Sequence, residues 1–169
     1  MDMNAFLTFI TLALVFFSSP VGAAYLVVSI EGTIDGGLAE FVDRNIREAE
    51  EMDAEGIIFH MNTPGGRIDS AVHIKDAILN SKTPTFAFVD KSAISAGALI
   101  SLAADSIYMT PGSSIGAATA VDLEGKKASE KVISYMRAQM RSTAEAKGRR
   151  PDLAEAMVDE DIGIPGVTE

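Results

Sequence analysis

Several residue types are missing or scarce in this chain of 169 residues, and each absence excludes a class of protein. There is no cysteine, which excludes disulfides, thiolate catalysis and cysteine-type zinc sites. Basic residues are outnumbered, with 14 Lys and Arg against 24 Asp and Glu and a formal net charge of -10. So acidic a chain lacks the cations that displace counterions from a phosphate backbone, and it is a poor candidate for nucleic-acid binding. We expect neither a metal nor a cofactor.

Histidine is also scarce, and this limits the kind of nucleophilic catalysis that is open to the chain. The two histidines are His60, in an expected strand, and His73, on the outer side of an expected helix. No histidine follows the candidate nucleophile described below, whereas an α/β-hydrolase places its histidine after the serine and the acid. That arrangement is therefore excluded. His60 remains a weak candidate for a base, and His73 is expected to face water.

The longest apolar run is at the N-terminus, and it bears on the compartment. Apolar residues and threonines extend without a break over residues 6–17, and a small-residue site follows that ends at Ala23 and Ala24. Both features fit a cleaved secretory signal. The run is shorter than the about 20 residues of a comfortable membrane span. No basic residue precedes it, which leaves an uncleaved anchor as the alternative. We expect residues 1–24 to be a signal peptide or membrane anchor of an exported protein.

Short apolar runs alternate with amphipathic stretches along the rest of the chain. Runs rich in Val, Ile and Phe predict buried strands, over residues 25–30, 56–61, 85–89 and 106–110. Apolar residues spaced three and four apart, and one stretch of small residues, predict helices, over residues 38–52, 68–79, 95–104, 128–147 and 151–158. This alternation predicts an α/β fold with a mostly parallel sheet.

Two runs of small residues each follow an expected strand and lead into an expected helix. The first is Asn-Thr-Pro-Gly-Gly at residues 62–66, and the second is Ala-Ile-Ser-Ala-Gly at residues 93–97. A glycine pair at such a junction lets backbone N–H groups approach a ligand closely. A serine at such a junction can be a nucleophile with the N–H groups of the helix behind it. Acyl transfer needs both a nucleophile and an oxyanion hole.

These two runs contain the candidate residues for acyl transfer. Ser95 is the candidate nucleophile, and the N–H group of Ala96 with that of Gly65 or Gly66 is the candidate oxyanion hole. The alternatives are ordinary ones, because a serine before a helix is often an N-cap and a glycine pair is often a turn.

A serine nucleophile needs a base, and lysine is the remaining option. Lys131 lies on the expected helix 128–147, one turn before Ser134 and Tyr135. A free lysine has a pKa near 10.4, so a lysine base at neutral pH has to sit in an apolar pocket that lowers this value. The sequence permits this helix to close over Ser95. A surface lysine near a helix start is the alternative.

Together these residues resemble a known family. The runs 62–66, 95–97 and 111–117 (Pro-Gly-Ser-Ser-Ile-Gly-Ala) occur in the order typical of NfeD-type membrane-bound serine proteases. These ClpP-class enzymes are related to signal peptide peptidase A and have the ClpP/crotonase spiral of repeated β-β-α units. The resemblance covers residues 25–169. It implies a serine endopeptidase without cofactors, in which a Ser–Lys dyad of Ser95 and Lys131 cleaves membrane-associated or hydrophobic protein segments.

The resemblance carries further expectations about organisation and partners. Family members continue beyond this point, so residues 25–169 are expected to be a protease domain truncated at its C-terminus. The resemblance also implies at least a homodimer, stomatin- or prohibitin-like membrane proteins as candidate partners, and a membrane-associated or periplasmic location. Two rival functions remain: an inactive ClpP-like scaffold in a membrane complex, and a crotonase-type enzyme that processes acyl-CoA.

The segment between the two halves of the candidate dyad is rich in Gly, Ser and Ala. Residues 112–127 are expected to form a mobile loop, because such residues bury little and lose much entropy on ordering. We therefore expect Ser95 and Lys131 to lie beyond hydrogen-bond reach in the resting protein. A peptide added as an extra strand beside Gly65 and Gly66 would draw the lysine helix inward.

Overall fold

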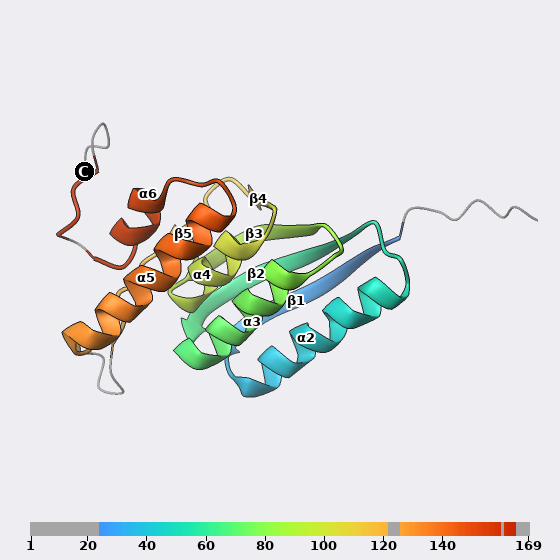
Figure 1. Cartoon of the computed structure of the whole chain (residues 1–169), viewed down its shortest axis with the longest axis horizontal. Helices are drawn as coiled ribbons and strands as arrows, with labels where there is room; N and C mark the ends of the chain where they lie inside the picture. Colours follow the sequence, from blue (N-terminus) through green and yellow to red (C-terminus); the bar gives the residue numbers. More distant parts are fainter. Residues whose placement is uncertain (1–23, 122–125, 160, 165–169) are drawn as a thin grey trace, which may run out of the picture.

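The computed structural model describes residues 24–121, 126–159 and 161–164, so the expected signal or anchor lies outside it except for Ala24. Its centre is a five-stranded sheet in the order β1-β2-β3-β4, with β5 paired to β3 (Figure 1). The strands are β1 Tyr25–Ile34, β2 Gly56–Gly66, β3 Thr85–Ile94, β4 Ser106–Met109 and β5 Ser114–Gly116. The helices are α2 Gly36–Glu51, α3 Ile68–Asn80, α4 Ala96–Ala103, α5 Glu130–Ala146 and α6 Pro151–Ala156.

The predicted α/β class with a parallel sheet is confirmed, since all ladders between the named strands are parallel. The pairing between the long strands is interrupted by an irregularity that divides each strand into two halves. The register shifts between Glu31 and Thr33 where β1 pairs with β2, and between Met61 and Thr63 where β2 pairs with β3. In the last repeat the two halves are separate strands, with β4 paired to the first half of β3 and β5 to its second half. The expected β-β-α unit is thus realised as strand, bulge, strand and helix.

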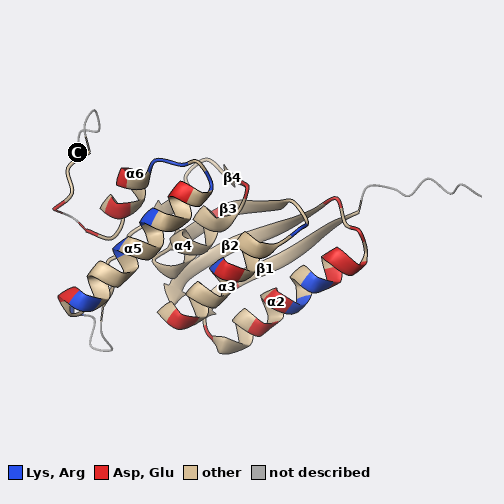
Figure 2. Cartoon of the chain, in the orientation of Figure 1, with Lys and Arg blue, Asp and Glu red and all other residues tan. Residues whose placement is uncertain are grey.

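The core lies between the sheet and the helices α2, α3 and α4, which cover the same face (Figure 1). Alternate strand residues point to this side and are fully buried, among them Val28, Phe59 and Val89. Helix α4 is buried along its whole length, and it contacts both the sheet and α5. Its small side chains allow this close packing on both sides. Charged side chains gather on the other helices and the connecting segments, whereas the strands are mostly uncharged (Figure 2).

The helix ends follow local chemistry. The side chain of Asp35 caps α2 as expected, because its Oδ1 accepts a hydrogen bond from the N–H of Leu38 at 2.9 Å.

In the described residues no helix combines the length and the apolar character that a membrane span requires.

A polar cluster holds the end of α5 against the sheet. Asp105 accepts hydrogen bonds from the N–H and hydroxyl of Thr85, both at 2.8 Å, and from Lys147 Nζ at 2.6 Å. Burial alone would raise the pKa of Asp105, but the hydrogen bonds from Lys147 and Thr85 outweigh it and hold this pKa below its ordinary value.

The prediction of a mobile loop over residues 112–127 is wrong for residues 114–119, which are ordered. Residues 114–116 form β5, and the segment after it is held by α6 and the residues that follow. The N–H of Ala118 donates to Met157 O at 2.7 Å, and the hydroxyl of Thr119 donates to Val158 O at 2.9 Å. These tertiary bonds order a sequence whose composition alone suggests mobility. Residues 122–125 lie outside the described residues.

Candidate active site

Ser95 is the single residue between β3 and α4, and its backbone is unusual. Its φ is 56° and its ψ is -118°, a conformation that costs a non-glycine residue on the order of 1–3 kcal/mol. Two hydrogen bonds hold it there: the N–H of Ser95 donates to Gly116 O at 2.8 Å, and Ser95 O accepts from the N–H of Ala98 at 2.9 Å. A strained strand-to-helix turn of this kind presents a side chain outward from the end of a sheet.

The N-cap alternative for Ser95 is wrong. A capping serine keeps an extended backbone and accepts a hydrogen bond from the second or third N–H of the helix. The side chain of Ser95 makes no such bond, and no hydrogen-bond partner for its Oγ exists within the described ranges. The hydroxyl is half-buried and available to a ligand.

The glycine pair lies directly against Ser95. Gly65 has φ 105°, and a Cβ built on it would be 2.7 Å from Ser95 Cβ and 3.3 Å from Ser95 Oγ. A Cβ on Gly66 would be 2.2 Å from Ile34 O. Real Cβ atoms do not approach other atoms so closely, so β2 can pass between β1 and Ser95 only with glycine at both positions.

Thr63 links three parts of this site, a role that its place in the run 62–66 did not reveal. Its side chain is fully buried; Oγ1 donates to Gly32 O at 2.6 Å and accepts from the N–H of Gly65 at 3.0 Å. Its Cγ2 methyl packs against α4, where a Cβ on Gly97 would be only 2.6 Å away. Thr63 therefore fixes the glycine pair relative to both β1 and the helix that follows Ser95. The sequence signal that could have indicated this role is a polar residue, Thr63, directly after the apolar part of a strand.

The candidate oxyanion hole consists of backbone N–H groups from β2 and α4, those of Gly66 and Ala96. The N–H of Gly65 is already bonded to Thr63. The N–H of Arg67 donates to Ile34 O at 2.8 Å. Because alternate residues of a strand face the same neighbour, the N–H of Gly66 points away from β1, toward the side of Ser95. Ala96 is the first residue of α4, and the N–H groups of a first turn have no acceptor within their helix.

Lys131 is not brought to Ser95 in this structure. It lies in the first turn of α5, and its side chain is exposed, whereas Ile133 and Met136 on the same helix are buried against the core. Over the described ranges, no hydrogen bond or ion pair joins Lys131 to Ser95. A working dyad would therefore require the side chain of Lys131, or the turn that carries it, to move toward Ser95.

Neither histidine is hydrogen-bonded to Ser95 in the described part of the chain. His60 points to the face of the sheet opposite the helices, where it contacts Glu31. His73 is exposed, as predicted. Lys75, a buried lysine that the helix pattern did not single out, bridges α3 and α5 through a 3.1 Å bond from Nζ to Gln139 Oε1. Among the described residues no cluster of His, Cys, Asp or Glu could hold a metal ion.

Comparison with known proteins agrees with the family resemblance. The family described as NfeD1b, N-terminal domain, matches residues 24–169. The membrane protein NfeD1b of Bacillus subtilis (strain 168) is 43% identical over 136 residues, which cover 80% of this chain and 31% of that protein. The membrane-bound protease PH1510 of Pyrococcus horikoshii is 35% identical over 163 residues, which cover 90% and 37%. This chain thus spans about a third of the length of these curated relatives.

Solved structures of related proteins have a similar fold. A serine-to-alanine variant of 1510-N, a membrane-bound stomatin-specific protease, has a TM-score of 0.76 and 35% identity, covering 82% of this chain and 70% of that chain. A lysine-to-alanine variant of 1510-N in complex with a substrate peptide has the same TM-score and identity, covering 82% and 67%. ClpP1 from Listeria monocytogenes, at 24% identity and a TM-score of 0.65, shares the fold and covers 79% of this chain and 78% of its own. The chain therefore belongs to the NfeD1b family, with a ClpP-like fold, and is homologous to a membrane-bound protease.

Proposed function

We propose that this chain is the endopeptidase domain of a membrane-associated serine protease, with Ser95 as nucleophile and Lys131 as base. The observation that carries the proposal is the backbone of Ser95, held at φ 56° with its hydroxyl unpaired among the described residues. This hydroxyl lies beside Gly65, where an added Cβ would be only 3.3 Å from Oγ. A structural serine gains nothing from such strain, whereas a nucleophile gains exposure and a fixed direction. Homology to the 1510-N protease supports the same interpretation.

The chemistry uses residues of this chain alone. Ser95 Oγ attacks the carbonyl carbon of the scissile peptide bond while its proton passes to the neutral amine of Lys131. The oxyanion receives hydrogen bonds from the N–H groups of Gly66 and Ala96, and Gly65 shapes the space beside it. Lys131 then returns the proton to the leaving amine. Water hydrolyses the acyl-enzyme by the same route in reverse, which restores both side chains.

Substrate binding would assemble this arrangement. Beyond the pair Thr63 and Ala93, β2 no longer pairs with β3, and its last residues pair only with β1. The other edge of this short segment is therefore available to an extended peptide, which would lie along Gly65 and Gly66 beside Ser95. Movement of α5 over the peptide would remove the Lys131 amine from water, and burial favours its neutral form.

The test is serine-directed labelling and peptide cleavage by the full chain. A fluorophosphonate probe should label the wild type and leave Ser95→Ala unlabelled. Cleavage of apolar peptides, followed by mass spectrometry, should fall by at least about 10³-fold in both Ser95→Ala and Lys131→Ala, because members of one catalytic unit act together. Lys91→Ala, an exposed lysine on β3, is the matched control and should retain full activity.

The same experiment separates the rival functions. An inactive scaffold would give no labelling of the wild type at any probe concentration. A crotonase-type enzyme would bind a CoA thioester in calorimetry, and that binding would persist in Lys131→Ala.

Location, partners and assembly belong to the same proposal. The relatives are named as a membrane protein and a membrane-bound protease, and we propose that residues 1–24 export or anchor this chain so that residues 25–169 work outside the cytoplasm as a homo-oligomer. The 1510-N protein is a membrane protease specific for a stomatin homolog from Pyrococcus horikoshii. By analogy, an apolar segment of a stomatin-like membrane protein is the proposed substrate. Sequencing the N-terminus of the protein recovered from membranes would show whether cleavage follows Ala23 or Ala24.

A further inference from the structure

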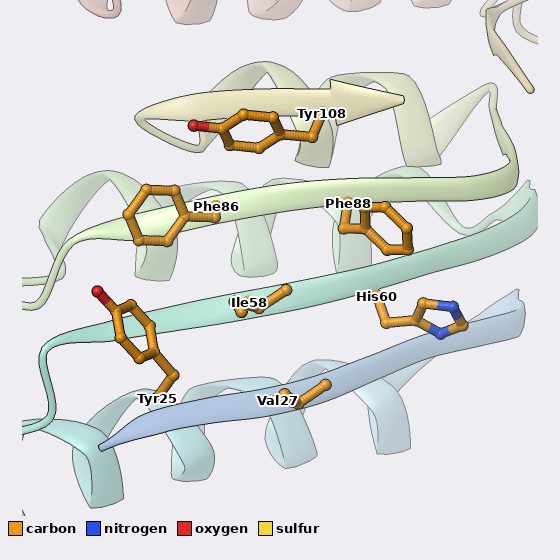
Figure 3. Close-up of a pocket in the computed structure, with 7 residues that line it drawn as sticks. All are labelled: Tyr25, Val27, Ile58, His60, Phe86, Phe88 and Tyr108. Atoms are coloured by element: carbon orange, nitrogen blue, oxygen red, sulfur yellow. The ribbon is translucent and has the colours of Figure 1, made fainter. Parts of the chain in front are cut away.

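One face of the sheet is not covered by any helix of the described residues. Strand residues that point away from α2, α3 and α4 line an open groove of about 570 Å³ (Figure 3). Its floor is apolar and is formed by Val27, Ile58, Phe86 and Phe88. Val27 is 62% exposed. The sequence predicted fully buried strands, and this is wrong for the outward half of their residues.

Aromatic rings close one end of the groove. The ring of Phe86 lies 6.4 Å from that of Tyr25 and 6.4 Å from that of Tyr108, measured between centroids. A Cβ on Gly56 would lie 2.7 Å from the Phe86 ring and 2.8 Å from the Tyr25 ring. The missing side chain of Gly56 therefore lets the two rings meet across β2.

The opposite end of the groove is acidic. His60 stacks on Phe88, with ring centroids 5.9 Å apart, and two carboxylates flank it. Its Nδ1 lies 3.2 Å from Glu31 Oε1, and its Nε2 lies 3.7 Å from Asp90 Oδ2. Both carboxylates reach solvent. No Lys or Arg is among the residues that line the groove in the described part of the chain.

We infer that this groove docks an apolar helix of a partner protein, with a lysine or arginine of that helix at the end over His60. Parallel sheets are almost always covered by helices on both faces, and here the described helices cover one. A helix is favoured over an extended peptide because the groove offers side chains, not backbone groups, so the occupant has to satisfy its own N–H and C=O groups.

Size and charge define the occupant further. From Tyr25 to His60 the floor spans about four residues of strand, roughly 13 Å at 3.3 Å each, which matches two to three turns of helix. Glu31 and Asp90 would pair with a cation at that end. They would repel an anionic lipid surface, and a second copy of the chain would bring another acidic end instead of a cation. This inference does not depend on the proposed protease activity.

The test uses the full chain and two synthetic helical peptides followed by fluorescence anisotropy. Both are Leu- and Ala-rich with about 14 residues, near four turns; one ends in Lys and the other in Glu. The wild type should prefer the Lys peptide by about 3–5-fold, and Glu31→Lys, which leaves only Asp90 to offset the new ammonium, should abolish the preference. Val27→Lys should weaken both peptides by about 10-fold, because it places a charge on the apolar floor. Met52→Lys, which replaces an exposed apolar residue outside the groove, should change neither.

Several outcomes would overturn the inference. It fails if neither peptide binds the wild type, if Val27→Lys leaves binding unchanged, or if Glu31→Lys leaves the preference unchanged. It also fails if Val27→Lys dissociates a dimer in sedimentation, which assigns the groove to a second copy, or releases the chain from anionic vesicles, which assigns it to a membrane. Should Val27→Lys not fold, as judged by circular dichroism, Tyr108→Lys at the same surface replaces it.

Discussion

Replacing Thr63 with valine removes one hydroxyl while keeping nearly the same shape. In the wild type this hydroxyl donates to Gly32 O and accepts from the N–H of Gly65. Gly65 is buried, so its N–H would lose its partner without gaining water, at a cost of about 1–3 kcal/mol. Gly32 is exposed and water can replace its lost bond, so that loss is about 0.5–1.5 kcal/mol. The expected total is about 1.5–4.5 kcal/mol.

The matched control is a second buried threonine. Thr143 is equally buried on α5, and its hydroxyl donates to Gln139 O at 2.7 Å, a helix carbonyl that also serves the backbone. Thr143→Val therefore leaves no group without a partner and should cost less than about 1 kcal/mol. Thr63→Ser keeps the hydroxyl and loses one methyl, so it should cost about 1 kcal/mol.

Urea unfolding of the full chain, followed by circular dichroism, gives these free energies from midpoint and slope. Hydrogen exchange at Gly65 adds a local measurement, because its amide should exchange much faster in Thr63→Val than in Thr63→Ser. If Thr63→Val and Thr143→Val unfold at the same urea concentration, the hydroxyl does not hold the glycine pair, and the role given to Thr63 is refuted.

The remaining predictions concern packing, pH and assembly. Gly97→Ala should destabilise the chain by about 1–3 kcal/mol in thermal unfolding, because its Cβ would overlap the buried methyl of Thr63; Gly36→Ala, with open space around it, should not. The lowered pKa of Asp105 means that its stabilisation is complete above the unfolded value of about 3.9 and is lost as pH falls below it. Asp105→Asn should therefore lower the urea midpoint at neutral pH, with a difference that shrinks at acidic pH; a constant difference would contradict this linkage. The family resemblance predicts at least a dimer, and a purely monomeric boundary in sedimentation velocity would count against it.

Much of the fold could be predicted because local patterns determine it. Apolar runs and helical spacing located the strands and helices, and Asp35 identified a helix start. The ends of the strands were harder, since β2 continues through the glycine run to Gly66 only because Thr33 and Ile34 of β1 pair with it. Strand β5 was missed for the same reason: Ser114 to Gly116 is ordered by pairing with β3, which composition cannot reveal.

In the candidate site, too, the residues governed by local sequence could be predicted, whereas those governed by distant contacts could not. Ser95 and the glycine pair could be named from the sequence because short-range sterics restrict what may stand there. The role of Thr63 could not, since it depends on Gly32, which lies 31 residues earlier in the chain. The position of Lys131 relative to Ser95 is not a local property either, because it depends on how α5 packs, and here the buried face of α5 is the one that carries Ile133 and Met136.

Because the backbone at Ser95 is left-handed, selection for stability and selection for function favour different residues at this position. Glycine adopts such a conformation without a Cβ penalty, so Ser95→Gly should raise the unfolding free energy by about 1 kcal/mol. Selection for stability alone would thus replace the serine, and only selection for its hydroxyl would retain it. A library of variants chosen for thermal resistance should drift to glycine here, whereas one chosen for labelling should not. The residue found at this position in each library would report which of the two pressures acts on the protein.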